Sequence, residues 1–200
     1  MIEDMAYPDG ATPLDPDERG GLKHRHITTR GELDELEQVN IASGLRWLTR
    51  QRGDVLTDNF ATTLHRQLFG EVWDWAGRLR KTGKNIGVDP VQIGVQLRQL
   101  MDDAMYWAGH RIYPPSEAAV RLHHRLVSIH PFPNGNGRHA RILADAALDR
   151  VYKAKPIDWA GGHDLAKMNS RREAYIAALK AADRGDIGPL LAFIGPRDDL

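Results

Sequence analysis

The chain has 200 residues, which is the length of about one domain. Its hydrophobic fraction of 42% and charged fraction of 27% are typical of a folded globular protein. The 27 Lys and Arg residues balance the 27 Asp and Glu residues, which disfavours a globally basic protein that binds nucleic acid or anionic membranes. Cysteine is absent, so disulfides, thiolate nucleophiles and cysteine-ligated metal clusters are excluded.

The N-terminal residues do not have the pattern of a secretory signal. The first twenty are acidic and contain proline, whereas a signal peptide has a basic stretch followed by an apolar one. No apolar run approaches the roughly 18–20 residues of a membrane-spanning helix. We therefore expect a cytoplasmic protein that contacts neither a membrane nor, directly, nucleic acid, and the oligomeric state is left open.

Three segments can be distinguished along the chain. Residues 1–28 contain several prolines and glycines and few large apolar side chains, which predicts an irregular N-terminal arm. Thr29 and Glu32 have the spacing of a capping box and precede apolar residues at helical spacing. Residues 29–55 are therefore predicted to hold a helix of roughly 20 residues, a candidate regulatory element. Residues 56–195 form the main domain.

The main domain has the periodicity of a helical protein. Thr57 and Asp58 begin one helical pattern. Further helices are predicted over residues 91–108, 116–129, 136–149, 165–182 and 187–194. The segment 79–90 contains too many glycines and prolines for a helix and indicates a hairpin or an ordered loop. Because strands do not alternate with helices, we expect an all-α helical bundle with a short β-hairpin flap.

The segment from Ile129 to Arg141 is unlike the rest of the chain. Pro131 and Pro133 cannot lie inside a continuing helix, so His130 is expected at a turn where one helix ends. An imidazole with a pKa near 6.5 can take a proton from an attacking hydroxyl near neutral pH. Taken alone, such a histidine is more often a helix cap or a packed residue.

The start of the following helix has the composition of an anion site. Gly135 and Gly137 let the backbone approach a ligand closely, and the helix N-terminus offers free N–H groups that favour phosphate. Arg138 and Arg141 lie three residues apart on one face and can converge on the same polyphosphate. Each feature alone is more often a turn or a solvated surface, but together they predict a phosphoryl or nucleotidyl transfer site.

This segment resembles the Fic motif, His-Pro-Phe-x-(Asp/Glu)-Gly-Asn-Gly-Arg-x-x-Arg. The matching residues are His130, Pro131, Phe132, Gly135, Asn136, Gly137, Arg138 and Arg141. Trp75, Ala76, Gly77 and Arg80 look like the start of the target-binding flap of that family. The resemblance covers roughly residues 56–193, and the whole chain looks most like the subgroup called mobile mystery protein B.

The resemblance implies a Fic fold and an adenylyltransferase that moves AMP from ATP to a hydroxyl of a target protein. By motif position, His130 is the general base and Phe132 anchors the loop in the core. Asn136 and the amides of Gly135, Gly137 and Arg138 hold the α- and β-phosphates, Arg138 also contacts the β/γ-phosphates, and Arg141 reaches the γ-phosphate. The flap residues that clamp the target as an added strand are Lys84, Asn85, Ile86, Gly87 and Val88.

Asn134 departs from the motif, which usually has Asp or Glu to hold Mg²⁺ at this position. A neutral amide keeps the geometry but loses the charge, so we expect Mg²⁺ to be used with weakened affinity. The alternatives are a catalytically weak or inactive nucleotide-binding module and the transfer of another nucleotide or phosphate group. Doc-like members, which phosphorylate their target, alter the glycine loop, and that loop is intact here.

Regulation is suggested by the same resemblance. Many members carry a helix with (Ser/Thr)-x-x-x-Glu-(Gly/Asn), whose glutamate pairs with the second motif arginine. Glu37 is the inhibitory candidate here, although Leu33 and Gln38 do not fit that pattern. The simpler interpretation is a solvated acidic helix face. The subgroup also implies a toxin-like role and a helix-turn-helix partner of the mobile mystery protein A type.

A zinc site formed by His123, His124 and His130 is disfavoured. Adjacent residues point ~100° apart on a helix, and no HExxH pattern or carboxylate frame accompanies them.

Overall fold

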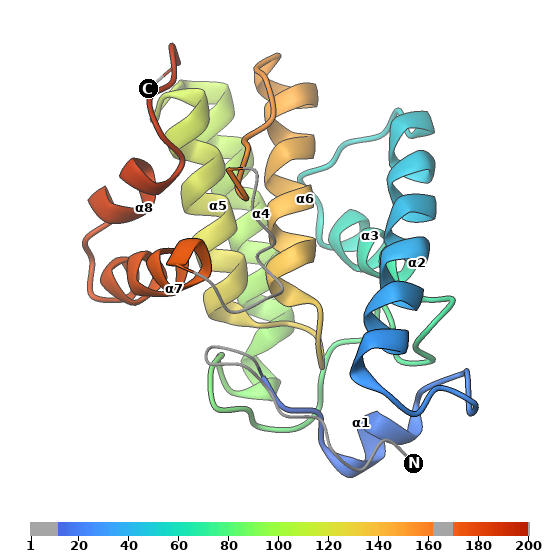
Figure 1. Cartoon of the computed structure of the whole chain (residues 1–200). Coiled ribbons are helices and arrows are strands. Elements are labelled where there is room, and N and C mark those ends of the chain that lie inside the picture. The colour runs from blue at the N-terminus through green and yellow to red at the C-terminus, as the bar shows by residue number, and fades with distance from the viewer. Residues whose placement is uncertain (1–11, 162–169, 200) are drawn as a thin grey trace.

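The computed structural model describes residues 12–161 and 170–199, and this part of the chain is largely helical (Figure 1). The α-helices are α1 (Pro16–Gly20), α2 (Arg30–Arg50), α3 (Asp58–Phe69), α4 (Ile93–His110), α5 (Pro115–Ile129), α6 (Asn136–Ala147), α7 (Ser170–Asp183) and α8 (Gly188–Phe193). A 3₁₀ turn, η1 (Pro90–Gln92), precedes α4, and a π-helical turn, η2 (Leu148–Tyr152), continues α6. The all-α prediction is confirmed. None of these helices is long and apolar enough to cross a membrane.

The helix starts follow local sequence signals. The Thr29 hydroxyl accepts the N–H of Glu32, and the Glu32 carboxylate accepts the N–H of Thr29, so the capping box is confirmed. The Thr57 hydroxyl caps α3 by accepting the N–H of Phe60 at 3.0 Å.

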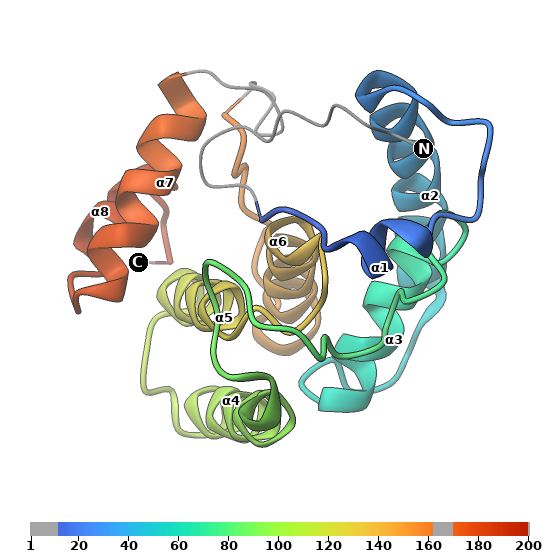
Figure 2. The same ribbon diagram turned by 90° about the horizontal axis from the view of Figure 1, so that it is seen from below.

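Helix α6 lies at the centre of the bundle, with α4 and α5 on one side and α2 and α3 on the other (Figure 2). Helices α7 and α8 pack against α5. One hydrophobic cluster joins α2 to α6 and includes the fully buried Leu64, Leu126 and Leu143. A second cluster lies between α5, α6 and the two C-terminal helices and includes Val120 and Leu190. The N-terminal end of α6 is therefore fixed from several directions.

The segment 79–90, called the flap loop below, is an ordered loop without strands, so the prediction of a β-hairpin is wrong. Its backbone donors bond to the segment around His130 instead of to each other. The N–H of Arg80 donates to the Pro131 carbonyl at 2.9 Å, and the N–H of Val88 donates to the Ile129 carbonyl at 3.3 Å. The described part of the chain has one isolated antiparallel bridge, between Leu22 and Trp73.

The described part of the N-terminal arm packs on the domain. Thr12 and Leu14 are buried, and α1 follows them, so the arm is not irregular throughout. Residues 1–11 of the predicted arm and residues 165–169 of the predicted helix 165–182 lie outside the described residues.

Candidate active site

His130 forms the turn between α5 and the loop that leads to α6. Its backbone is left-handed, with φ 54° and ψ 62°, and its N–H donates to the Leu126 carbonyl. This conformation costs a non-glycine residue about 1 kcal/mol, and the following Pro131 prevents the helix from continuing. The side chain is thereby turned out of the helix and lines a cavity of about 1040 Å³.

The His130 imidazole is buried, and no group of the described residues bonds to it with regular hydrogen-bond geometry. The residue is 5% exposed. Burial, followed by the positive charge of Arg80, lowers its pKa to about 4; Lys84 acts in the same direction, and the Val127 backbone acts against them. The ring is therefore neutral at pH 7 and carries a free lone pair that can accept a proton.

The loop before α6 is braced by its own side chains. Gly135 has φ 77°, and a Cβ at this position would lie 2.7 Å from the Phe69 ring, so glycine is required. Phe132 is fully buried, as the resemblance implies. The Asn136 amide accepts the N–H of Phe132 at 2.9 Å and donates to its carbonyl at 2.8 Å. The Asn136 side chain therefore shapes the loop, and the backbone N–H groups at the start of α6 remain the donors suited to an anion.

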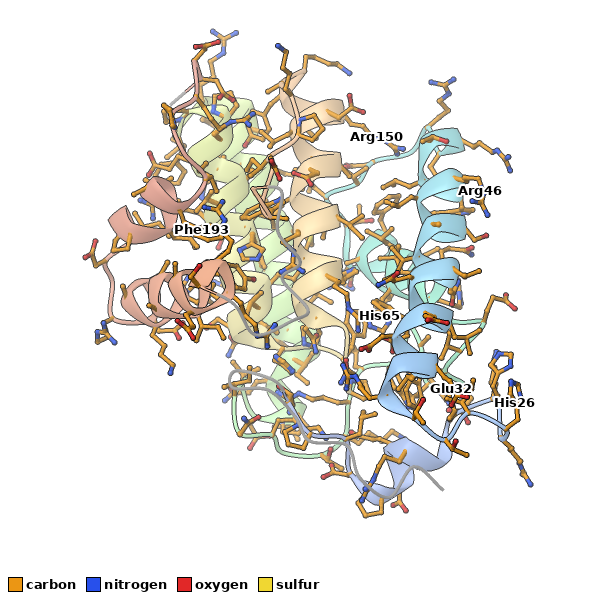
Figure 3. All side chains as sticks on the ribbon, in the orientation of Figure 1. His26, Glu32, Arg46, His65, Arg150 and Phe193 are labelled. Carbon is orange, nitrogen blue, oxygen red and sulfur yellow. The ribbon has the colours of Figure 1, made fainter. Side chains whose placement is uncertain are left out.

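Sequence reasoning missed His65 of α3, which is labelled in Figure 3. It contacts both the turn at Gly77 and the loop before α6. Its Nδ1 accepts the N–H of Gly77 at 3.0 Å, so its Nε2–H is left to donate to the Asn134 carbonyl at 3.0 Å. The ring also stacks on Phe132 with 3.7 Å between centroids. Burial keeps the pKa of His65 well below its usual value, so the ring is neutral. No local sequence signal marks this role.

The cavity that His130 lines is strongly cationic, although the chain as a whole has no net charge. Its lining includes Arg30, Arg125, Arg138, Arg141, Arg172 and Lys180, against Asp34 and Asp183. Such a surplus of positive charge in a hollow site favours a polyanionic ligand.

The two motif arginines have different partners. Arg138 Nη1 lies 2.5 Å from the Glu37 carboxylate, whose other oxygen accepts the Trp73 indole N–H at 2.7 Å. Arg141 Nη1 instead donates to the Tyr175 hydroxyl at 3.3 Å. The inhibitory pattern would pair Glu37 with Arg141, so the observed pairing with Arg138 differs from it. Glu37 is 3% exposed, and the interpretation as a solvated acidic face is wrong for this residue.

The flap loop reaches His130 at Gly87. There φ is 105°, and a Cβ would lie 2.7 Å from the His130 Cβ and 2.5 Å from the Arg80 guanidinium, so only glycine fits. Residues 85–88 line the cavity together with His130. Lys84 does not: its buried ammonium bonds to the Asp15 carboxylate at 3.0 Å and to Glu18. Lys84, one of the five predicted flap residues, is therefore bound to the N-terminal arm and does not line the cavity.

The residues present fit a protein-held Mg²⁺ poorly. The Asn134 side-chain oxygen already accepts the Gly135 N–H at 2.6 Å, and it carries no charge. Within the described ranges, no group of three or more His, Asp or Glu side chains could hold a metal. His123 and His124, considered above for zinc, bond to Tyr175 and Asp183.

Comparison with known proteins finds a family match over the segment that contains His130 and the start of α6. Residues 55–148 match the family model described as Fic/DOC family. Protein adenylyltransferase Fic of Nematostella vectensis is 28% identical over 170 residues, which cover 81% of this chain and 38% of that protein.

Solved structures agree as well. Fic-1 (residues 134–508) of Caenorhabditis elegans has a TM-score of 0.66 and 25% identity, covering 84% of this chain and 50% of that one. BepC of Bartonella tribocorum, solved with bound AMPPNP, has a TM-score of 0.68 at 18% identity, covering 94% of this chain and 93% of that one. The chain spans only about a third of the length of the curated relatives it matches.

Proposed function

Residues 55–148 belong to the Fic/DOC family, and from this premise we propose that the chain transfers AMP from ATP to a hydroxyl side chain of a target protein. The observation that carries the proposal is the buried, neutral His130 imidazole, which makes no hydrogen bond of regular geometry to the described residues and lines a cationic cavity at the start of α6. Such a group suits the removal of a proton from a hydroxyl beside a polyphosphate. The adenylyltransferase names of the relatives support the choice of AMP.

The proposed reaction is an in-line displacement at the α-phosphorus. The target hydroxyl gives its proton to His130 as its oxygen forms a bond to the α-phosphorus of ATP. The bond from the α-phosphorus to the oxygen bridging to the β-phosphate breaks, and pyrophosphate leaves. His130 then returns the proton to water, and AMP remains esterified to the target.

The surrounding residues bind and orient. We assign the α- and β-phosphates to the backbone N–H groups of Asn136, Gly137 and Arg138 in the first turn of α6, where the helix dipole is positive. Arg138 and Arg141 bind the outer phosphates, and Arg138 must first leave or share its contact with Glu37. The target backbone pairs with the flap loop at residues 85–87, which places its hydroxyl near His130.

Mg²⁺ would neutralise part of the charge that develops on the phosphates. It would be held mainly by the nucleotide and water, with Asn134 contributing weakly. The assignment to the mobile mystery protein B subgroup, the toxin-like role, the cytoplasmic location and the helix-turn-helix regulator also remain predictions from the resemblance.

A nucleotide-binding module that performs no transfer is the second candidate function. Two features favour it. Asn134 lacks the charge that would hold a catalytic metal ion, and Arg138 is paired with Glu37 and not free to orient a triphosphate for transfer. The two candidates share a ligand and differ in whether a covalent product forms.

The test is intact-mass spectrometry of the protein incubated with Mg²⁺ and ATP, GTP, CTP or UTP, followed by labelling in lysate with a tagged nucleotide. We expect a gain of one AMP on the chain or on a lysate protein, which His130→Ala abolishes. The same product with His130→Ala would remove the general base from the proposal. No product from any nucleotide, with ATP binding retained by calorimetry, would select the binding module.

A further inference from the structure

Arg141 contacts one buried ring side chain outside the motif, Tyr175, which is in turn bonded to a second, His123. Its Nη1 donates to the Tyr175 hydroxyl of α7 at 3.3 Å, and its Cζ lies 5.5 Å from the centroid of the Tyr175 ring. The same hydroxyl is hydrogen-bonded to Nε2 of His123 of α5 at 2.9 Å. Tyr175 is 6% exposed and His123 is fully buried. Side chains of α5, α6 and α7 thus meet at the Tyr175 hydroxyl.

The cluster of Arg141, Tyr175 and His123 lies next to Gly137 at the start of α6. A Cβ built on Gly137 would lie 3.6 Å from Arg141 Nη1 and 3.9 Å from the Tyr175 hydroxyl. Tyr175, Arg141 and Gly137 all line the cavity of His130. The phenol oxygen is therefore beside the backbone N–H groups that suit an anion, on the ligand side of the helix.

The chemistry of the contact sets Arg141 apart from Arg138. A carboxylate that pairs with an arginine orients it but also compensates its charge, as Glu37 does for Arg138. A phenol oxygen accepts the guanidinium N–H and leaves the charge in place. The nearby Asp145 carboxylate accepts the N–H of Ile157 and the Trp159 indole N–H, and it interacts with the charge of Arg141 without a direct hydrogen bond to it.

His123 completes the support without adding a competing charge. Desolvation, with the positive charge of Arg141 as the next cause, keeps the pKa of His123 well below its usual value. The neutral ring packs 4.5 Å from the Trp159 ring, which fixes its direction toward Tyr175. Its other nitrogen has no partner in the described part of the chain, so Tyr175 is its single hydrogen-bond contact there.

We propose that Tyr175 and His123 are positioning residues for Arg141, which hold its guanidinium beside Gly137, without a carboxylate hydrogen bond, so that it is directed at the terminal phosphates of the nucleotide. The proposal rests on the proposed nucleotide site but not on transfer. If it holds, Tyr175 and His123 contribute to the preference for a nucleoside triphosphate over a monophosphate, although neither residue contacts the reacting atoms.

The test is calorimetric titration of the full chain with ATP and with AMP. Tyr175→Phe and His123→Phe keep the rings and remove the hydrogen bonds. We expect each variant to bind ATP about 3- to 10-fold more weakly, the loss of one hydrogen bond to a charged group, while its AMP affinity stays within about twofold. In an Arg141→Ala background, Tyr175→Phe should cause no further loss, because both changes act through the same guanidinium.

The matched control is Tyr106→Phe, a change at an exposed tyrosine on α4, which should bind like the parent protein. Unchanged ATP binding by Tyr175→Phe, equal losses for ATP and AMP, or an additive loss with Arg141→Ala would each overturn the proposal. If thermal melting shows that Tyr175→Phe is unfolded, His123→Phe decides by the same criteria. ATP binding without AMP transfer would refute the proposed function alone, whereas a parent protein that binds no ATP would refute both.

Discussion

The guanidinium of Arg80 donates its Nε–H to the backbone carbonyl of His130 at 2.6 Å. Its two other nitrogens donate to the carbonyls of Thr82 at 2.7 Å and Val88 at 2.5 Å. Arg80 is 3% exposed, so one buried fork ties both ends of the flap loop to the backbone of His130. The position of the imidazole and the position of the flap loop are thereby coupled.

Arg80→Lys should break this coupling, because an ammonium is a single point that cannot reach three separated carbonyls in the plane of a fork. We expect the free energy of unfolding to fall by about 2–4 kcal/mol from the lost charged hydrogen bonds. The rate of AMP transfer should fall by about tenfold or more, since a misplacement of catalytic groups by an ångström has effects of this size or larger. Chemical denaturation and labelling kinetics measure the two effects. Full activity in a destabilised variant would show that Arg80 supports the fold alone.

The pH dependence of the reaction should reflect the low pKa of His130. The active form is the neutral ring, so kcat/KM for the free protein should fall only as the pH drops toward about 4, instead of near 6.5. Rates of transfer at constant ionic strength and ring resonances in NMR spectra report this pKa. An acid limb centred near 6.5 would contradict the burial of a neutral His130.

The same pKa affects stability. Between about pH 4 and 6.5 the unfolded chain binds the proton and the folded His130 does not, so stability rises with pH across this window and is lost as the pH falls. His65, His123 and His139 have lowered pKa values for the same reason of burial and act in the same direction. His130→Asn should therefore reduce, not abolish, the slope of unfolding free energy against pH.

Glu37→Gln should release Arg138. The amide oxygen can still accept the Trp73 N–H, but the charge that compensates Arg138 is gone. We expect ATP to bind about 3- to 10-fold more tightly and AMP transfer to rise, since a charged contact of ~1 kcal/mol or more no longer competes with phosphate. Glu35→Gln, at an exposed position on the same helix, is the control. Equal or lower activity in Glu37→Gln would exclude an inhibitory role for Glu37.

Asn134→Asp should restore the carboxylate that the motif usually has. We expect the Mg²⁺ concentration for half-maximal transfer to fall by about tenfold, because a carboxylate is a stronger ligand for a hard cation than an amide. Transfer measured across a Mg²⁺ series checks this, with Asn59→Asp at an exposed position of α3 as the control for added charge. The same Mg²⁺ dependence in both variants would show that position 134 does not approach the metal.

The sequence by itself determined the helical class, most helix starts and the position of the chemistry. These features depend on neighbouring residues: Thr29 and Glu32 are three residues apart, and the Fic motif spans twelve. The end of a helix at His130 follows from Pro131 and Pro133 in the same short segment. Such signals act within one or two turns of chain, so their residue pattern is legible without a fold. The need for glycine at 135 and the burial of Phe132, by contrast, depend on the core, which includes the Phe69 ring.

Only the tertiary structure decided which side chains surround the candidate site. Glu37 meets Arg138 across 101 residues, Arg80 meets His130 across 50, and Tyr175 meets His123 across 52. The flap loop does not form the expected hairpin, because its N–H groups donate to carbonyls around His130. Lys84 bonds to the N-terminal arm. These pairings depend on how α2, α5 and α7 pack around α6, and helix packing is set by the fit of whole faces, which no local spacing records.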